Sequence, residues 1–263
     1  MKEFDVKKTV KECVDWIRDW FNNYGKDSPA VIGISGGKDS AVVATLCAMA
    51  LGKDRVIGVQ MPQGIQPDIA DSDEIIKWLG IKSYCVNIGN AYKAIASQLD
   101  IIGLKDNSVA NTNLPPRLRM AVIYAVSQRI NGRVANTCNL SEDYIGWSTK
   151  WGDSCGDFSP ISNLTCTEVI KIGEYLGIPN HLIYKTPSDG LCGKSDEEKF
   201  GFSYETLDNY IRDTEGEIDL DAPENSVIKD RIIPMHLSPN TRLKQYGIPS
   251  FVPSTLKWNG WNN

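Results

Sequence analysis

The sequence predicts an α/β protein in which helices flank a doubly wound parallel sheet, within a single domain of 263 residues. Apolar stretches of strand length alternate with longer stretches of helical spacing, the order that is typical of parallel sheets with right-handed crossovers. A turn rich in glycine and serine joins the first strand to the helix after it. No internal repeat and no linker divides the chain.

The N-terminal elements follow from their hydrophobic patterns. Apolar residues recur at helical spacing over residues 4–23, with charges between them, which predicts an amphipathic first helix. Residues 30–34 are apolar or small and predict a short buried strand. The helix predicted at 40–51 ends at Gly52, because glycine commonly terminates helices.

The same alternation continues through the first half of the chain. The predicted segments are a strand at 55–60, a loop at 61–67, a helix at 68–80, a strand at 83–87 and a helix at 90–103. A further helix is predicted after Pro115 and Pro116, with a face marked by Leu118, Val122, Val126 and Ile130, and then a fourth strand at 133–137. Ligands of such sheets bind beyond the C-terminal ends of the strands, so the loops 35–40, 60–67 and 136–142 should converge.

Regular structure becomes sparser after residue 142. Residues 145–160 are polar, rich in glycine and aromatic, and a loop of this length in a compact chain is commonly functional. Helices are predicted at 165–177 and 203–213, with a flexible stretch at 187–199 between them. The tail beyond the helix at 203–213 shows no strong periodicity, so that helix is expected to be the last.

Composition excludes several classes of protein. Hydrophobic residues make up 41% and charged residues 23%, as in ordinary globular proteins, and no apolar run approaches the roughly 20 residues that span a bilayer. Seven cysteines without a C-x-x-C pair argue against a disulfide framework or a zinc site and favour a cytoplasmic protein. The net charge of −5 favours a small-molecule substrate over a nucleic acid.

The turn at residues 35–40, Ser-Gly-Gly-Lys-Asp-Ser, predicts an anion site. Unpaired N–H groups and the positive end of the helix dipole point at one spot, and glycine lets a phosphate approach the backbone. Asp39 adds nothing to anion affinity by itself, so it suggests a magnesium ion that bridges it to phosphate. A P-loop is excluded because Asp39 follows Lys38 and because Ile32 stands where the first glycine should be. The Rossmann spacing is also absent.

The pattern S-G-G-x-D-S resembles the pyrophosphate loop of ATP pyrophosphatases, which split ATP between its α and β phosphates and transfer AMP to a substrate oxygen. Further stretches resemble the ammonia-dependent NAD synthetases: 113–120, 137–142, 146–153, 157–161, 185–191, 195–197 and 201–208. The resemblance runs in unbroken order over roughly residues 4–213. It implies an adenine nucleotide alpha-hydrolase-like fold and a homodimer that binds the dinucleotide near the subunit interface.

The resemblance also implies a role for each matching residue. The ATP contacts would be Gly33, Ile34, Ser35, Gly36, Gly37, Lys38, Asp39, Ser40, Thr137, Cys166 and Ser188. Asp39 and Glu142 would hold Mg²⁺. The deamido-NAD contacts would be Asn113, Arg117, Trp147, Lys150, Asp157, His236 and Leu237. Asp153 and Lys150 are the catalytic candidates, and Asp153 would orient or deprotonate ammonium.

Three positions depart from the family pattern. Lys38 replaces the usual glutamine, Cys166 stands where many members have a lysine that reaches the ATP phosphates, and Leu237 stands where a lysine is common. We hypothesise that Lys38 restores the charge lost at Cys166. Unchanged ATP affinity in a Lys38→Gln variant would count against that hypothesis.

The reaction implied by the resemblance is the last step of NAD synthesis, a ligation that forms a C–N bond. The carboxylate of deamido-NAD attacks the α-phosphorus of ATP, pyrophosphate leaves, and ammonia then displaces AMP from the acyl-adenylate. Residues 147–158 and 188–199 are predicted to be lids that exclude water from this intermediate. The expected substrates are thus ATP, deamido-NAD and ammonia. The expected protein partner is a second copy of the chain, and neither a nucleic acid nor a membrane is expected to bind.

Two alternatives stay open at this point. One is a tRNA-modifying ATP pyrophosphatase, weakened by the acidic balance and by the absence of C-x-x-C. The other is a nucleotide-binding regulator without chemistry, suggested by Cys166 and Leu237. Glutamine as nitrogen donor would require a cysteine nucleophile in its own domain, whereas Cys13 lies in a predicted helix and the chain has two histidines. Ammonia, free or from a separate protein, is therefore expected.

Overall fold

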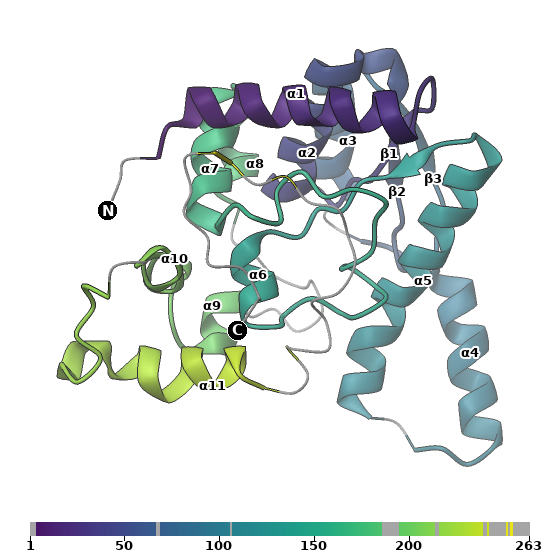
Figure 1. Ribbon diagram of the computed structural model, residues 1–263. Coiled ribbons are helices and arrows are strands. Elements are labelled where there is room, and N and C mark those ends of the chain that lie inside the picture. Colours follow the sequence, from purple (N-terminus) through teal and green to yellow (C-terminus); the bar gives the residue numbers. More distant parts are fainter. Residues whose placement is uncertain are drawn as a thin grey trace.

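The computed structural model describes residues 4–66, 69–105, 107–185, 195–213, 216–238, 241, 251 and 253–254. Four parallel strands form one sheet in the order β3-β2-β1-β4 (Figure 1). Their bounds are β1 (Ala30–Gly33), β2 (Val56–Gln60), β3 (Lys82–Cys85) and β4 (Arg133–Val134). Helices cover both faces of this sheet, which confirms the predicted fold class.

Strand β1 lies at the centre of the sheet. Ala30 pairs with Val56 of β2 on one side and with Arg133 of β4 on the other. Both edges are short. Strand β4 is two residues long and is extended only by a single bridge between Ala135 and Phe158, while β3 at the opposite edge is four residues long. The loop that follows β1 therefore starts in the middle of the sheet.

Alternate residues of β1 point to different helices, as the pleat of a strand requires. On one face Ile32 joins the core formed with α1 (Val6–Tyr24), α2 (Lys38–Leu51), α3 (Ile69–Leu79) and α7 (Cys166–Tyr175). On the other face Val31 packs with Val59, Val134 and Ile123, the last from α5 (Ser108–Arg129). The site at the end of β1 is thus held by two separate hydrophobic cores.

The first helix forms where its apolar pattern predicts. Asp5 caps α1, its carboxylate accepting the Lys8 N–H at 2.9 Å, and the buried side chains follow at helical spacing, as in Val10, Ile17 and Phe21. The predicted strands and the helices at 40–51, 68–80, 90–103, 165–177 and 203–213 are likewise confirmed, with shifts of a few residues at their ends.

The prediction that α5 begins after the two prolines is wrong. The helix begins at Ser108, capped by the Asn107 side chain, which accepts the Val109 N–H at 2.8 Å, and Pro115 and Pro116 lie inside it. The extra turns run beside α4 (Gly89–Ile101), and the two helices together project from the body of the molecule (Figure 1).

A second hydrophobic cluster forms beside α7, mainly from elements in the C-terminal part of the chain. Its elements are α6 (Leu140–Tyr144), α9 (Asp196–Phe200), α10 (Tyr204–Arg212), a π-helix η3 (Ile228–Ile232) and α11 (Ile233–His236). Shorter pieces are α8 (Asn180–Ile183) and the 3₁₀ turns η1 (Lys53–Arg55) and η2 (Pro223–Asn225). The expectation that α10 is the last helix is therefore wrong, because η3 and α11 follow it. None of the described helices combines the length and apolar character that a membrane span requires.

Candidate functional site

Two adjoining cavities open where strands β1, β2 and β4 end. Their volumes are about 260 Å³ and about 620 Å³. Both are lined by Ser35, Pro116, Arg119, Thr137 and Asp153, so they meet along these residues. The predicted convergence of the loops 35–40, 60–67 and 136–142 is confirmed, since each contributes lining residues.

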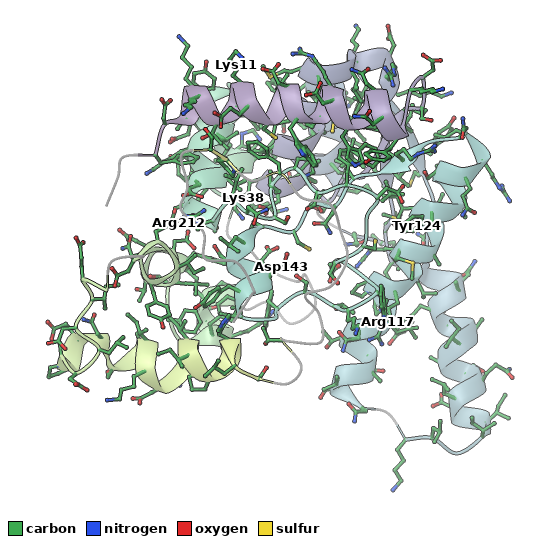
Figure 2. All side chains as sticks on the ribbon, viewed as in Figure 1. Lys11, Lys38, Arg117, Tyr124, Asp143 and Arg212 are labelled. Carbon is green, nitrogen blue, oxygen red and sulfur yellow. The ribbon has the colours of Figure 1, made fainter. Side chains whose placement is uncertain are left out.

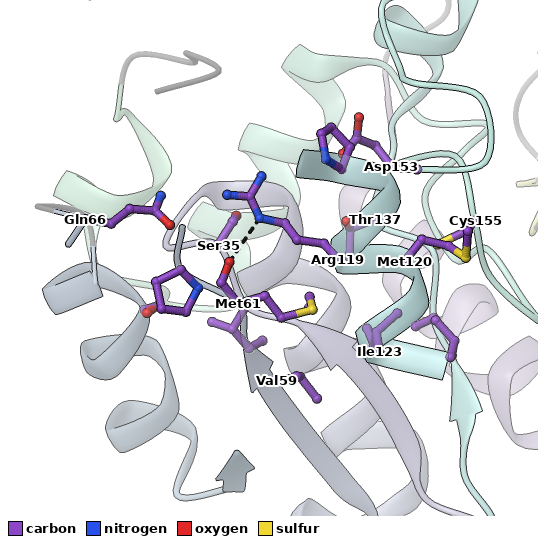
Figure 3. Close-up of a pocket in the computed structure, with 18 of the residues that line it drawn as sticks. Ser35, Val59, Met61, Gln66, Arg119, Met120, Ile123, Thr137, Asp153 and Cys155 are labelled. Carbon is purple, nitrogen blue, oxygen red and sulfur yellow. Dashed lines mark hydrogen bonds between the residues drawn. The ribbon is translucent and has the colours of Figure 1, made fainter. Parts of the chain in front are cut away.

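The smaller cavity has an apolar wall and a polar rim (Figure 3). Val59 and Ile123 belong to the wall, and Arg119 crosses the rim from α5. The Arg119 Nε donates to the Met61 carbonyl at 3.0 Å. Burial lowers the pKa of Arg119 while the nearby Asp153 raises it, and a guanidinium keeps its charge in either case. A flat apolar group would fit the wall with an anionic group beside Arg119.

The sequence analysis singled out Arg117, whose contact with the dinucleotide remains a prediction, and did not single out Arg119 on the same helix. Residues two apart on a helix point to different sides. Arg117 is exposed and its Nε donates to the Lys150 carbonyl at 3.3 Å, whereas Arg119 enters the cavities. The signal that could have distinguished them is the apolar face of α5, which places Ile123, four residues after Arg119, toward the sheet.

The larger cavity contains the glycine-serine loop at the start of α2. Gly37 is the N-cap and has no side-chain cap, so the first N–H groups of α2 remain available to an anion. The two serines hold the loop: Ser40 Oγ donates to the Gly37 carbonyl at 3.0 Å, and Ser35 Oγ accepts the Gly37 N–H at 3.3 Å. Gly36 has φ +88°, a left-handed conformation that favours glycine.

A carboxylate pair, Asp39 and Glu142, lies beside this loop, and Asn139 holds the two residues together. The Asn139 Nδ2 donates to Asp39 Oδ1 at 3.1 Å, and its Oδ1 accepts the Glu142 N–H at 3.1 Å. The Asn139 N–H donates in turn to Glu142 Oε2 at 3.4 Å, which completes a capping box at α6. Asn139 is fully buried. Sequence reasoning did not single it out.

Lys38 balances the charge of this pair. Its Nζ lies 2.9 Å from Asp39 Oδ2, and the side chain is buried. Burial and the neighbouring Asp39 raise the pKa of Glu142 well above its usual range, and Lys38 opposes that rise. Burial would lower the pKa of Lys38, but Asp39, Cys166 and Glu142 raise it above the ordinary value. Lysine is therefore charged in this site at neutral pH.

The carboxylate pair fits a magnesium ion that is shared with a substrate. Mg²⁺ is usually held by one or two carboxylates together with substrate phosphates and water, rather than by a complete protein cage. Among the described residues no group of three or more His, Cys, Asp or Glu side chains forms such a cage. Asp39 and Glu142 both line the larger cavity beside the anion-binding loop, where a phosphate would complete the coordination.

Four further predicted residues line the larger cavity: Asn113, Thr137, Trp147 and Asp153. Thr149 connects two of them, donating from Oγ1 to Asn113 Oδ1 at 2.8 Å and from its N–H to Asp153 Oδ2 at 3.1 Å. This fixes one oxygen of the exposed Asp153 carboxylate. Trp147 packs edge-on against Phe200 of α9 with ring centroids 4.5 Å apart, so the second hydrophobic cluster supports the cavity wall.

Other predicted contacts do not line either cavity, and their roles remain predictions. Lys150 places its ammonium 5.3 Å from the Trp151 ring centroid. Asp157 accepts the Val134 N–H at 2.7 Å. His236 stacks on Tyr144 with ring centroids 3.9 Å apart, and its Nδ1 lies 3.0 Å from the Tyr144 carbonyl.

Three remaining predictions concern ATP, the second substrate and a lid. Cys166 is buried at the start of α7, where its N–H donates to Ser141 Oγ at 2.9 Å and burial raises the pKa of its thiol. Leu237 is half exposed and lines neither cavity. Ser188 and most of the predicted lid at 188–199 lie outside the described residues. All three remain predictions.

Comparison with known proteins gives consistent results. The family model described as NAD synthase matches residues 9–240. An NH(3)-dependent NAD(+) synthetase from Thermococcus sibiricus is 35% identical over 237 residues, covering 90% of this chain and 91% of its own. Among solved structures, the NMN synthetase from Francisella tularensis matches with TM-score 0.81 and 32% identity, over 95% of this chain and 100% of that one. The NH3-dependent NAD synthetase from Campylobacter jejuni matches with TM-score 0.69 and 26% identity, over 90% and 98%.

Proposed function

The chain belongs to the NAD synthase family, and from this premise we propose that it amidates deamido-NAD with ammonia at the expense of ATP. The products are NAD, AMP and pyrophosphate, and the intermediate is an acyl-adenylate. The observation that carries the proposal is the pair of adjoining cavities, since the anion-binding loop and the carboxylate pair line the larger one and Asp153 lies where the two meet. A reaction between two bound substrates needs such a shared space.

We place ATP across both cavities. The apolar wall of the smaller cavity suits the adenine base, and the loop at 35–40 in the larger cavity suits the phosphates. Arg119 lines both cavities, so its guanidinium is positioned to meet negative charge between base and pyrophosphate. Thr137 lies at the same junction and offers a hydroxyl.

Asp39 and Glu142 would hold the Mg²⁺, and Asn139 fixes their relative position. When bound, this ion supplies positive charge that offsets the negative charge on the phosphates as pyrophosphate leaves. The N–H groups at the start of α2 donate toward the same phosphates, because Gly37 leaves them uncapped. The substrate carboxylate can then approach the α-phosphorus without facing an unscreened anion.

Asp153 serves the second half of the reaction. Its carboxylate is oriented by the Thr149 N–H and lines the junction of the cavities. A carboxylate there attracts ammonium and accepts a proton from the nitrogen that attacks the acyl carbon. Lys150, three residues earlier, would neutralise the dinucleotide.

A second candidate acceptor is the mononucleotide, deamido-NMN. The observation in its favour is the larger TM-score with the Francisella tularensis NMN synthetase, 0.81, than with the Campylobacter jejuni NAD synthetase, 0.69. Both acceptors present the same nicotinate carboxylate, so the chemistry at Asp39, Glu142 and Asp153 would be unchanged. The two differ in whether an AMP moiety must also be bound.

We further propose that the protein is a homodimer joined through α4 and α5. The projecting end of this helix pair exposes a cluster of apolar side chains, among them Ile101 at 72%, Ile102 at 69% and Val109 at 65% exposure. Clustered exposed apolar residues mark association surfaces. Ile102→Asp should convert the dimer to a monomer in sedimentation analysis, whereas Tyr175→Asp, at an exposed site on α7, should not. Equal sedimentation of both variants and the wild type would refute this interface.

We also place the protein in the cytosol, where thiols stay reduced. The six cysteines in the described part of the chain are free, and four of them are buried. Fractionation of cells that express the tagged protein would test this location.

The deciding experiment is an assay with ATP, Mg²⁺ and ammonium chloride in which deamido-NAD and deamido-NMN are supplied separately. Equimolar NAD and AMP from deamido-NAD support the main proposal, and a larger kcat/KM with deamido-NMN supports the second acceptor. Arg119→Met should raise the KM for ATP, while Arg129→Met, at the end of α5 and outside both cavities, should not. AMP without amide would favour another acceptor, such as tRNA, and no AMP would favour the non-catalytic regulator.

A further inference from the structure

We propose that Lys38 is the resident counter-cation of the Asp39–Glu142 pair and competes with the divalent metal ion for it. The metal would then bind weakly to the free protein and tightly only when a nucleotide offers its phosphates to the displaced lysine. Lys38 would thereby make tight binding of the metal follow binding of the nucleotide. The nucleotide part of this inference rests on the proposed function, whereas the competition for the carboxylates does not.

The position of Lys38 carries the inference. Its ammonium lies 2.9 Å from Asp39 Oδ2, and the two side chains are only 5% and 19% exposed. The ammonium also lies 5.9 Å from the centroid of the Tyr204 ring, a cation–π contact that closes the site from the side of α10. Lys38 lies in the interior of the molecule (Figure 2), so water does not screen this charge as it would at a surface.

The location is unfavourable for a lysine unless the carboxylates hold it there. Lys38 is the first residue of α2, where the helix dipole disfavours a cation and Gly37 supplies no cap. Burying an ammonium is costly without a partner of opposite charge. The two carboxylates are also unfavourable on their own, because adjacent half-buried carboxylates repel each other. Lysine and carboxylates therefore stabilise one another in the free protein.

A divalent ion that binds the pair must first replace this lysine. Two like charges cannot share one carboxylate oxygen, so the affinity for the metal includes the cost of moving the ammonium. An ammonium released from Asp39 remains beside the start of α2, where phosphate oxygens would bind. Asp39 lines the same cavity. When nucleotide is present, the metal can therefore bind Asp39 while the lysine binds the phosphates.

The test measures binding of Mn²⁺ alone, by electron paramagnetic resonance, to the whole protein without nucleotide. Lys38→Gln should bind Mn²⁺ at least about tenfold more tightly than the wild type, because the competing charge is gone. Lys38→Arg keeps the charge and should bind as the wild type does. Lys11→Gln removes a charge from the outer face of α1 (Figure 2) and should also behave as the wild type.

The outcomes separate this inference from the proposed function. Equal or weaker Mn²⁺ binding by Lys38→Gln, with an unchanged thermal transition, overturns the competition. Tighter binding by Lys38→Arg as well shows that charge is not the cause and overturns it too. If Asp39→Asn leaves Mn²⁺ binding unchanged, the metal is bound elsewhere, so both this inference and the proposed metal site fail. If Lys38→Gln behaves as expected while the amidation assay fails, the competition stands and the reaction must be revised.

Discussion

Asn139 is the residue whose replacement should reveal how the carboxylate pair is held. Asn139→Ala removes the N-cap of α6, which costs roughly 0.5–2 kcal/mol, and the donor to the charged Asp39, which costs about 1.5–3 kcal/mol. The Asn139 side chain is fully buried, so water does not compete for either bond in the folded protein. The two terms together predict a loss of roughly 3 kcal/mol in the free energy of unfolding.

The measurement is urea denaturation followed by tryptophan fluorescence. Asn139→Ser separates the two terms, because serine caps helices about as well as asparagine, lacks the amide that donates to Asp39 and adds no charge beside it. Asn23→Ala, at an exposed position where the side chain donates to the Asp19 carbonyl, should change stability by less than about 0.5 kcal/mol. A loss below about 1 kcal/mol in Asn139→Ala would refute the reasoning, since the bond to Asp39 alone should exceed that size.

Three further predictions concern stability. Arg212→Met should cost about 3–5 kcal/mol in thermal unfolding, because it leaves Glu168 buried without the guanidinium now 2.6 Å and 2.8 Å from its oxygens; a loss under 1 kcal/mol would contradict this. Burial raises the pKa of Asp208 above its ordinary value of 3.8, so the folded state holds that proton more tightly. The contribution of Asp208 to the free energy of unfolding should therefore fall as pH rises from 3.8 through the raised pKa, and the difference between the wild type and Asp208→Asn should show this fall in urea titrations at several pH values. Gly146→Ala should cost about 1–3 kcal/mol by scanning calorimetry, because φ is +67° and the new Cβ would meet Thr241 Oγ1 at 2.3 Å; a neutral result would show that residue 241 moves freely.

The sheet and the anion-binding loop were predictable because local rules determine them. Strand β1 is apolar, and the Gly-Gly turn leads directly into a helix, so neighbouring residues contain the whole signal. The contacts that complete the site are not local. Asn139 reaches Asp39 across 100 residues of sequence, and only the parallel pairing of β1 with β4 brings them together.

The errors have identifiable physical causes. Proline lacks an N–H and normally breaks the hydrogen-bond ladder, yet α5 continues through Pro115 and Pro116 from its cap at Asn107. The helices η3 and α11 escaped prediction because few of their residues are buried, with Ile228 and Ile232 carrying the packing. Arg119 escaped because a sequence motif does not show which side of a helix faces the sheet.

The edges of the sheet determine whether copies of this chain can aggregate by adding strands to one another. An exposed edge strand offers a row of free backbone groups on which another chain can add a strand, a common route to aggregation. Here β4 offers two residues before the Phe158 bridge, and β3 offers four with Lys82 at its start. Neither edge, in the described part of the chain, is long enough to template an extended ladder, which is consistent with the proposed association through side chains on the helices. The projecting α4–α5 pair can thus expose apolar side chains while the sheet edges stay too short for strand addition.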